Sequence, residues 1–163
     1  MARIQMPLQV AEQHWRAEAN APKLGEALAL RSWITWMQGE RAQALPVARQ
    51  ALALLPAGEM QWRGVSLALV GEEELLAGKL HAARQTFTQT RALWQATQNA
   101  YGTLALTLAL GEVYTRQGEL HQAAQLYQQV LTEAEHTPMD RHQALSRIGT
   151  ARLGLGTLRH GVE

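Results

Sequence analysis

The sequence predicts an all-α fold: a right-handed superhelical solenoid of antiparallel helix pairs, with about three full repeats and flanking helices. Three observations predict it. Residues 110–131 read as two amphipathic helices joined by a tight turn, the glycine of that turn recurs at a nearly constant spacing, and small residues keep a fixed position relative to it. A regular period of this kind is typical of proteins in which each helix pair packs on the next.

The stretch 110–131 shows how one such pair is built. Its first helix carries Gly111 and Tyr114, and its second carries Ala123 and Tyr127. Spacings of three and four residues place apolar side chains on one face of a helix. We expect the small residues where the two helices cross closely and the tyrosines in the space beside them.

The turn glycine recurs along the chain at intervals of 39, 40 and 38 residues. The four glycines are Gly39, Gly78, Gly118 and Gly156. Alanine follows the first three glycines five residues later, at Ala44, Ala83 and Ala123. A small residue precedes all four glycines by seven residues, at Ser32, Gly71, Gly111 and Gly149. The period is longer than the common 34-residue form, which indicates longer helices and connecting loops.

The first segment, residues 1–20, is expected to form an N-terminal helix that acts as a cap or half repeat. Pro7 favours a helix that begins there and runs to about Ala19, because the first turn of a helix does not need the missing N–H. The first full repeat, 21–57, begins after Asn20, which can cap its first helix. Pro46 lies inside the second helix, so that helix is expected to start late or to bend.

The second repeat, 58–97, is predicted to use helices at 59–77 and 80–96. Glu74 replaces the aromatic residue of the third repeat, so its carboxylate should face water or a basic partner. The third repeat, 98–136, begins near Asn99. A partial fourth repeat, 137–156, starts at Thr137 and Pro138, which have the sequence of a helix N-terminus.

Residues 157–163 are expected to be a short tail, too short for a packed helix. A solenoid that stops there would expose an apolar face. We therefore expect a fragment of a longer protein, or an end that another subunit covers.

The composition is that of a globular protein, with 47% hydrophobic and 18% charged residues. The formal net charge of +1 and the absence of a basic stripe argue against direct nucleic-acid binding. No stretch has the length of a signal peptide core or a membrane span. Cysteine is absent, which fits a cytoplasmic protein. We expect a cytoplasmic protein with no membrane contact.

The pattern of small and large residues around Gly118 resembles the tetratricopeptide repeat, or TPR. The longer period, the LLP ending at Leu54–Pro56 and the phrases GELHQAAQLYQQVL and IGTARLGLG are similar to one group in particular. They resemble the TPR sensor region of MalT-like regulators, which are LuxR-family, ATP-dependent transcriptional activators. The resemblance covers roughly residues 24–158.

This resemblance implies a domain that receives a small inducer or a regulatory protein and thereby controls assembly and transcription. The sequence contains no G-x-x-x-x-G-K-[ST] phosphate loop and no basic helix-turn-helix segment. We therefore expect this chain by itself neither to hydrolyse ATP nor to bind DNA.

The first helices of such repeats line the concave surface, and solenoids commonly bind partners there. The alignment of the repeats on their turn glycines places the following candidate residues on that surface: Trp33, Trp36, Met37, Glu72, Leu75, Leu76, Glu112, Thr115, Arg116 and Thr150. The tryptophans could stack on a planar ligand or hold an apolar peptide side chain. Two simpler interpretations stay open: the tryptophans pack against Leu8 and Trp15, and Glu112 and Arg116 form a surface ion pair.

No catalytic motif is present, and we expect no enzyme activity, no cofactor and no metal. His136, Asp140 and His142 straddle a helix start without a second pair of ligands, so a structural or solvated role is favoured over a zinc site. The sequence thus predicts a sensor and interaction domain whose partner is a protein, a peptide or a small inducer. It can also self-associate through exposed end helices. The alternative is a freestanding adaptor that binds a peptide or protein in its concave groove.

Overall fold

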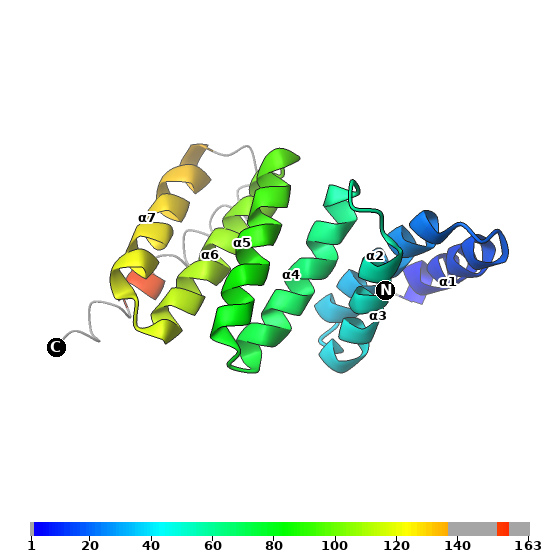
Figure 1. The fold of residues 1–163 in the computed structure, drawn as a ribbon, viewed down its shortest axis with the longest axis horizontal. Helices are drawn as coiled ribbons and strands as arrows, with labels where there is room; N and C mark the ends of the chain where they lie inside the picture. Colours follow the sequence, from blue (N-terminus) through cyan, green and yellow to red (C-terminus); the bar gives the residue numbers. More distant parts are fainter. Residues whose placement is uncertain (1, 137–152, 157–163) are drawn as a thin grey trace. The chain divides into compact units, whose positions relative to one another are not determined.

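The computed structural model of the 163-residue chain describes residues 2–136 and 153–156. Within these residues the regular structure is helical, with no strand. The helices, labelled in Figure 1, are α1 (Ala2–Ala17), α2 (Ala21–Met37), α3 (Arg41–Leu54), α4 (Met60–Leu76), α5 (Leu80–Ala96), α6 (Ala100–Gln117) and α7 (Leu120–His136). The predicted all-α repeat fold is confirmed, and its right-handed superhelical sense stays a prediction.

The chain forms two compact units, Met1–Glu73 and Glu74–Glu163, which divide within α4. In the first unit α2 packs against both α1 and α3. In the second unit α6 packs against both α5 and α7 (Figure 1). Short turns join these neighbours, so consecutive helices run antiparallel. Each unit therefore has a central helix with a neighbour on two sides.

Glycine forms three of the turns between consecutive helices. Gly39, Gly78 and Gly118 have φ of +84°, +71° and +78°, the left-handed region that glycine adopts at little cost. At the third turn the N–H of Gly118 donates to the carbonyl of Thr115 at 3.1 Å, and the next N–H donates to the carbonyl of Tyr114 at 2.9 Å. This pair of bonds closes the end of a helix in the Schellman motif. The three predicted turn glycines are confirmed.

The prediction of a fourth turn at Gly156 is wrong. Residues 153–156 are helical, and Gly156 is not among the described glycines with positive φ. Glycine also fits inside a helix, so its spacing alone could not distinguish a turn from a helical position.

Two further turns have the same shape without glycine. Ala19 and Gln98 have φ of +53° and +56°, in a region that costs a residue with a side chain about 1–2 kcal/mol. An asparagine follows each of them and caps the next helix. Asn20 Oδ1 accepts a hydrogen bond from the backbone N–H of Lys23 at 3.2 Å. In the same way, Asn99 Oδ1 accepts one from the backbone N–H of Gly102 at 2.9 Å. The predicted cap at Asn20 is confirmed.

The link between α3 and α4 uses charged side chains instead. The Glu59 carboxylate accepts from the N–H groups of Trp62 and Arg63 at 2.7 and 3.3 Å, at the start of α4. The Arg63 guanidinium donates to the carbonyls of Leu52 and Leu55 at 3.2 and 2.9 Å, at the end of α3. Each charge also has the favourable sign for the helix end that it contacts.

Two prolines lie inside helices, although one helix was expected to begin at its proline and the other to start late or to bend. Helix α1 begins at Ala2 instead of Pro7, and α3 begins at Arg41 in spite of Pro46. Each proline is exposed, so the backbone carbonyl that loses its N–H partner can bond to water. Of the two alternatives predicted for the second helix of the first repeat, the late start is therefore wrong, and the bend at Pro46 stays a prediction. The division into repeats at 21–57, 58–97 and 98–136 stays a prediction, and most of 137–156 lies outside the described residues.

The core of the second unit is built around an aromatic ring in contact with glycine. A Cβ atom on Gly111 would lie 2.6 Å from Cε1 of Tyr127, and one on Gly154 would lie 2.6 Å from Cε2 of the same ring. Tyr127 is 3% exposed, and this burial raises the pKa of its phenol. The other buried residues of this core are Leu104, Leu108, Ala123, Val130 and Ala134. The predicted close crossing at Gly111 is confirmed.

A second contact of this kind joins α5 to α6. A Cβ atom on Gly102 would lie 2.3 Å from Cε3 of Trp94. The core of the first unit uses an aliphatic contact, because a Cβ on Gly25 would lie 3.0 Å from Cγ of Leu55. Leu55 belongs there to a cluster with Leu28, Ala29 and Ala51.

We expect Gly111→Val to lower the free energy of unfolding by about 2 kcal/mol or more, because the new side chain would occupy the space of the Tyr127 ring. Gly58→Val is the matched control, since no atom lies within 4 Å of a Cβ there, and it should change stability by about 0.5 kcal/mol or less. Urea unfolding followed by circular dichroism measures both. Equal stability of the two variants would contradict the close contact between Gly111 and the Tyr127 ring.

We expect Gln98→Gly to raise the free energy of unfolding by about 1 kcal/mol, because glycine removes the strain of the left-handed conformation. The same substitution at Gln89, exposed inside α5, should lower it by about 1 kcal/mol, since glycine disfavours a helix interior. Thermal unfolding of the two variants provides the comparison. A loss of stability in Gln98→Gly would contradict the turn geometry.

Candidate binding surfaces

Helix α2 presents an apolar face to solvent. Trp33 is 47% exposed and Met37 is 65% exposed, and their spacing of four residues places them on one side of the helix. Trp36 is half-buried on the same side, with the guanidinium carbon of Arg41 5.0 Å from its ring centroid. Exposed aromatic and methionine side chains in a group are typical of binding surfaces.

The predicted site residues of α4 differ in exposure. Leu76 is 53% exposed and Glu72 is half-buried, whereas Leu75 is 5% exposed and offers little surface to a partner. The neighbouring Glu74, which was expected to face water or a basic partner, accepts a hydrogen bond from the Thr86 hydroxyl at 2.7 Å. A neutral donor on α5 therefore satisfies this carboxylate.

The predicted site residues of α6 have partners within the chain. The Arg116 Nε lies 2.7 Å from the Glu112 carboxylate, and its Nη1 donates to the carbonyl of Leu75 at 3.4 Å. Thr115 donates to the carbonyl of Gly111 at 2.8 Å. A ligand on this face would have to compete with these contacts. Thr150, and the cluster of His136, Asp140 and His142, lie outside the described side chains.

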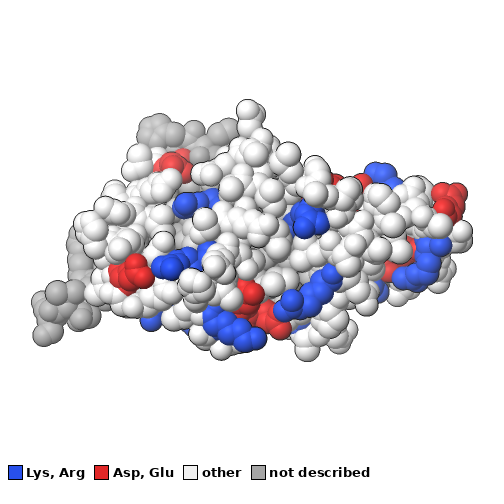
Figure 2. Space-filling model, in the orientation of Figure 1, with Lys and Arg blue, Asp and Glu red and all other residues white. Residues whose placement is uncertain are grey.

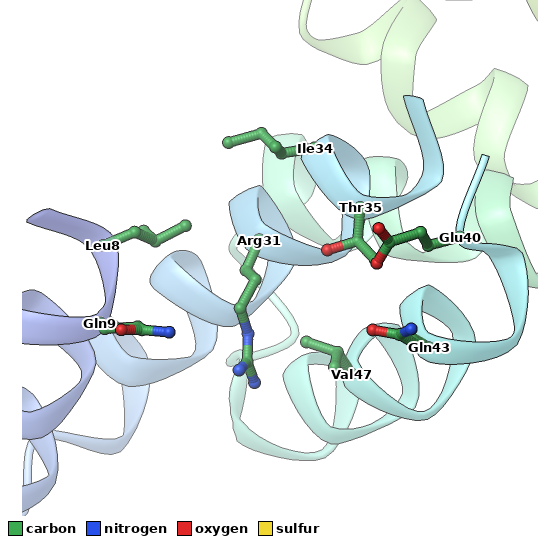
Figure 3. Close-up of a pocket in the computed structure, with 8 residues that line it drawn as sticks. All are labelled: Leu8, Gln9, Arg31, Ile34, Thr35, Glu40, Gln43 and Val47. Carbon is green, nitrogen blue, oxygen red and sulfur yellow. The ribbon is translucent and has the colours of Figure 1, made fainter. Parts of the chain in front are cut away.

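The first unit contains a pocket of about 200 Å³ that the sequence did not predict (Figure 3). It lies over α2, between α1 and α3. The lining residues are Leu8, Gln9, Arg31, Ile34, Thr35, Glu40, Gln43 and Val47. On α2 the pocket uses Arg31, Ile34 and Thr35, which lie on a different side of the helix from Trp33 and Met37. The helix therefore presents two separate surfaces.

An ion pair lies beside this pocket. The Nε atom of Arg31 lies 3.0 Å from a carboxylate oxygen of Glu12, whose side chain is 6% exposed. The orientation does not satisfy a hydrogen bond, because both atoms are buried without a hydrogen-bond partner among the described residues. A buried carboxylate without this cation would be costly, so Arg31 is fixed in place by charge.

Sequence reasoning missed this pocket, although one signal was present. Glu12 follows Leu8 by four residues and so lies on the apolar face of α1. A carboxylate on a buried face needs a partner, which here is Arg31 from the next helix. The sequence does not show which cation that partner is.

Charged side chains are interspersed on the face drawn in Figure 2, where lysine and arginine lie among glutamate. In the described part of the chain no helix is long and apolar enough to span a membrane. The same residues contain no group of three side chains that could hold a metal ion. The described surface thus offers apolar and mixed polar contacts.

A family model described as the MalT-like TPR region matches residues 25–155. The chain belongs to this family. The match confirms the resemblance that the sequence predicted over residues 24–158. Helical repeat regions of the MalT-like TPR type are generally non-catalytic and generally mediate protein interactions. Comparison with curated proteins and with solved structures found no match.

We expect Trp33→Ala in this MalT-like TPR region to change the free energy of unfolding by about 1 kcal/mol or less, because its side chain is largely in solvent. Trp94→Ala, at a ring that is 8% exposed, should cost about 3–5 kcal/mol. Denaturant unfolding of both variants measures the difference. Equal losses would place Trp33 in the core and favour its packing against the N-terminal helix.

Proposed function

We propose that the chain is a non-catalytic interaction and effector-sensing domain of a MalT-like, LuxR-type transcriptional regulator. It acts in the cytoplasm by non-covalent binding, which controls self-assembly of the regulator. The observation that carries the proposal is the family match over residues 25–155. The regulator's partner is a protein, a peptide or a small inducer, and this domain makes no direct contact with nucleic acid or membrane.

The partner surface of the proposal is the exposed side of α2, formed by Trp33, Trp36 and Met37. Its support is the exposure of Trp33 and Met37, since such side chains can bury apolar area on binding. The proposal also includes candidate residues on the other repeats: Glu72, Leu76, Glu112, Thr115, Arg116 and Thr150. Leu75, predicted with them, contributes little because it is 5% exposed. The internal contacts of Glu112 and Arg116 make α2 the stronger part of the proposal.

Self-association is proposed to use the outward face of α1. Met6 and Val10 are 73% and 63% exposed, and their spacing of four residues places them side by side on the helix. Two copies that meet through this face would remove both residues from water.

The alternative is a freestanding adaptor that binds a peptide or protein in its concave groove. The exposed pair of Trp33 and Met37 favours it, because this pair can hold an apolar peptide side chain. The reading frame around these residues separates the two proposals. A phosphate-loop domain upstream and a helix-turn-helix downstream are expected for the regulator and not for the adaptor.

We expect light scattering of the purified chain over a concentration series to show growth from monomer to dimer. The double variant Met6→Ala/Val10→Ala should weaken the dimer by about tenfold or more. The matched variant Trp33→Ala/Met37→Ala removes a similar exposed pair on α2 and should leave the dimer unchanged. A strict monomer at every concentration would contradict the assembly proposal and favour the adaptor.

A further inference from the structure

We infer that the pocket over α2 binds a small aliphatic α-amino acid or a zwitterion of the same chemistry. The inference rests on the proposed function, because an effector-sensing domain needs a ligand site. Its location differs from the partner surface, since neither Trp33 nor Met37 lines the pocket. The argument uses the charge, hydrogen-bonding groups and size of the pocket.

The positive side of the pocket is the Arg31 guanidinium. Glu12 lies against its Nε atom at 3.0 Å, and the Arg31 side chain, which ends in two terminal amino groups, is 35% exposed. These two groups form the planar fork that matches a carboxylate. Figure 3 shows the Arg31 side chain extending from α2 between Gln9 of α1 and Val47 of α3.

The negative side of the pocket is Glu40, in the turn between α2 and α3. Its carboxylate makes no hydrogen bond to the N-terminus of α3, and it has no ion-pair partner among the described side chains. Glu40 is exposed at the rim of the pocket. It supplies a negative charge on the α3 side, separate from the cation on α2, to which an ammonium group on the ligand can bind.

Neutral polar groups complete the lining. Figure 3 shows Gln9 extending from α1, and Gln43 from α3, toward the space beside Arg31. Both glutamines are exposed and Thr35 is half-buried, and all three line the pocket. Such groups fix the orientation of a polar ligand.

The rest of the lining is aliphatic. Leu8, Ile34 and Val47 come from three different helices, so they offer an apolar wall to a ligand side chain. The volume of about 200 Å³ is below the roughly 300–1,000 Å³ of pockets for drug-sized ligands. A carboxylate, an ammonium group and an aliphatic side chain on one small molecule therefore match the three parts of the pocket.

The test is isothermal titration calorimetry of the full chain with three probes. L-leucine carries both charges, 4-methylpentanoate lacks the ammonium group, and 3-methylbutylamine lacks the carboxylate. We expect saturable binding of L-leucine and about tenfold weaker binding of each analogue, which is the loss of one charge-assisted contact.

Variants identify the site. Glu40→Gln should remove the preference for L-leucine over 4-methylpentanoate, whereas Glu18→Gln, at an exposed carboxylate outside the pocket, should keep it. Arg31→Gln alone would leave Glu12 buried without its cation. The double variant Glu12→Gln/Arg31→Gln removes both charges together and should lose the preference for L-leucine over 3-methylbutylamine.

No saturable heat with L-leucine at about 10 mM, a concentration that would detect even millimolar affinity, would overturn the inference. Equal binding of the three probes, or wild-type selectivity in Glu40→Gln, would also overturn it. None of these three results affects the dimer measurement, because Met6 and Val10 do not line the pocket. Failure of the site and failure of the assembly proposal are therefore distinguishable.

Discussion

The packing of aromatic rings directly on glycine backbones is the constraint on which the second unit depends. The Tyr127 ring lies between Gly111 and Gly154, and Trp94 lies against Gly102. Any side chain at these glycines would push the ring, and with it the helix, away from its neighbour. The close spacing of α5, α6 and α7 therefore follows from a few residues whose only special property is that they lack a Cβ atom.

The turns make this packing repeatable along the chain. Each glycine turn closes its helix with two backbone bonds, so the next helix starts at a fixed place and returns antiparallel. Ala19 and Gln98 adopt the same turn at an energetic cost, which indicates that the tertiary packing of the flanking helices determines the turn. At the glycine turns, the residue's own backbone preference and the tertiary packing both favour the left-handed conformation. At Ala19 and Gln98 only the tertiary packing favours it.

Much of the fold was predictable because the signals are local. The turn glycines, the Asn20 cap and the contact between Gly111 and Tyr127 each depend on residues near one another in a helix pair. Pro7 and Pro46 did not predict where their helices begin, which is at Ala2 and at Arg41. An exposed proline beyond the first turn costs one hydrogen bond, and the packing of the helix can outweigh that cost.

The candidate surfaces were predictable in part. The aromatic face of α2 follows from its spacing, whereas the pocket depends on side chains from three helices. Glu12 signalled a buried partner on the apolar face of α1, but its pairing with Arg31 is a tertiary contact that the spacing within one helix does not contain. The structure thus separates residues that pack helices together from exposed residues and residues that line a pocket.

The measurement that tests this separation most directly is a ¹H–¹⁵N NMR titration of the chain with L-leucine. The account predicts shifts for backbone amides of α1, α2 and α3 near Arg31 and Glu40, with the amides of Gly111 and Tyr127 unchanged. Shifts centred on the core of the second unit, or no shift in the first unit at saturating ligand, would contradict it.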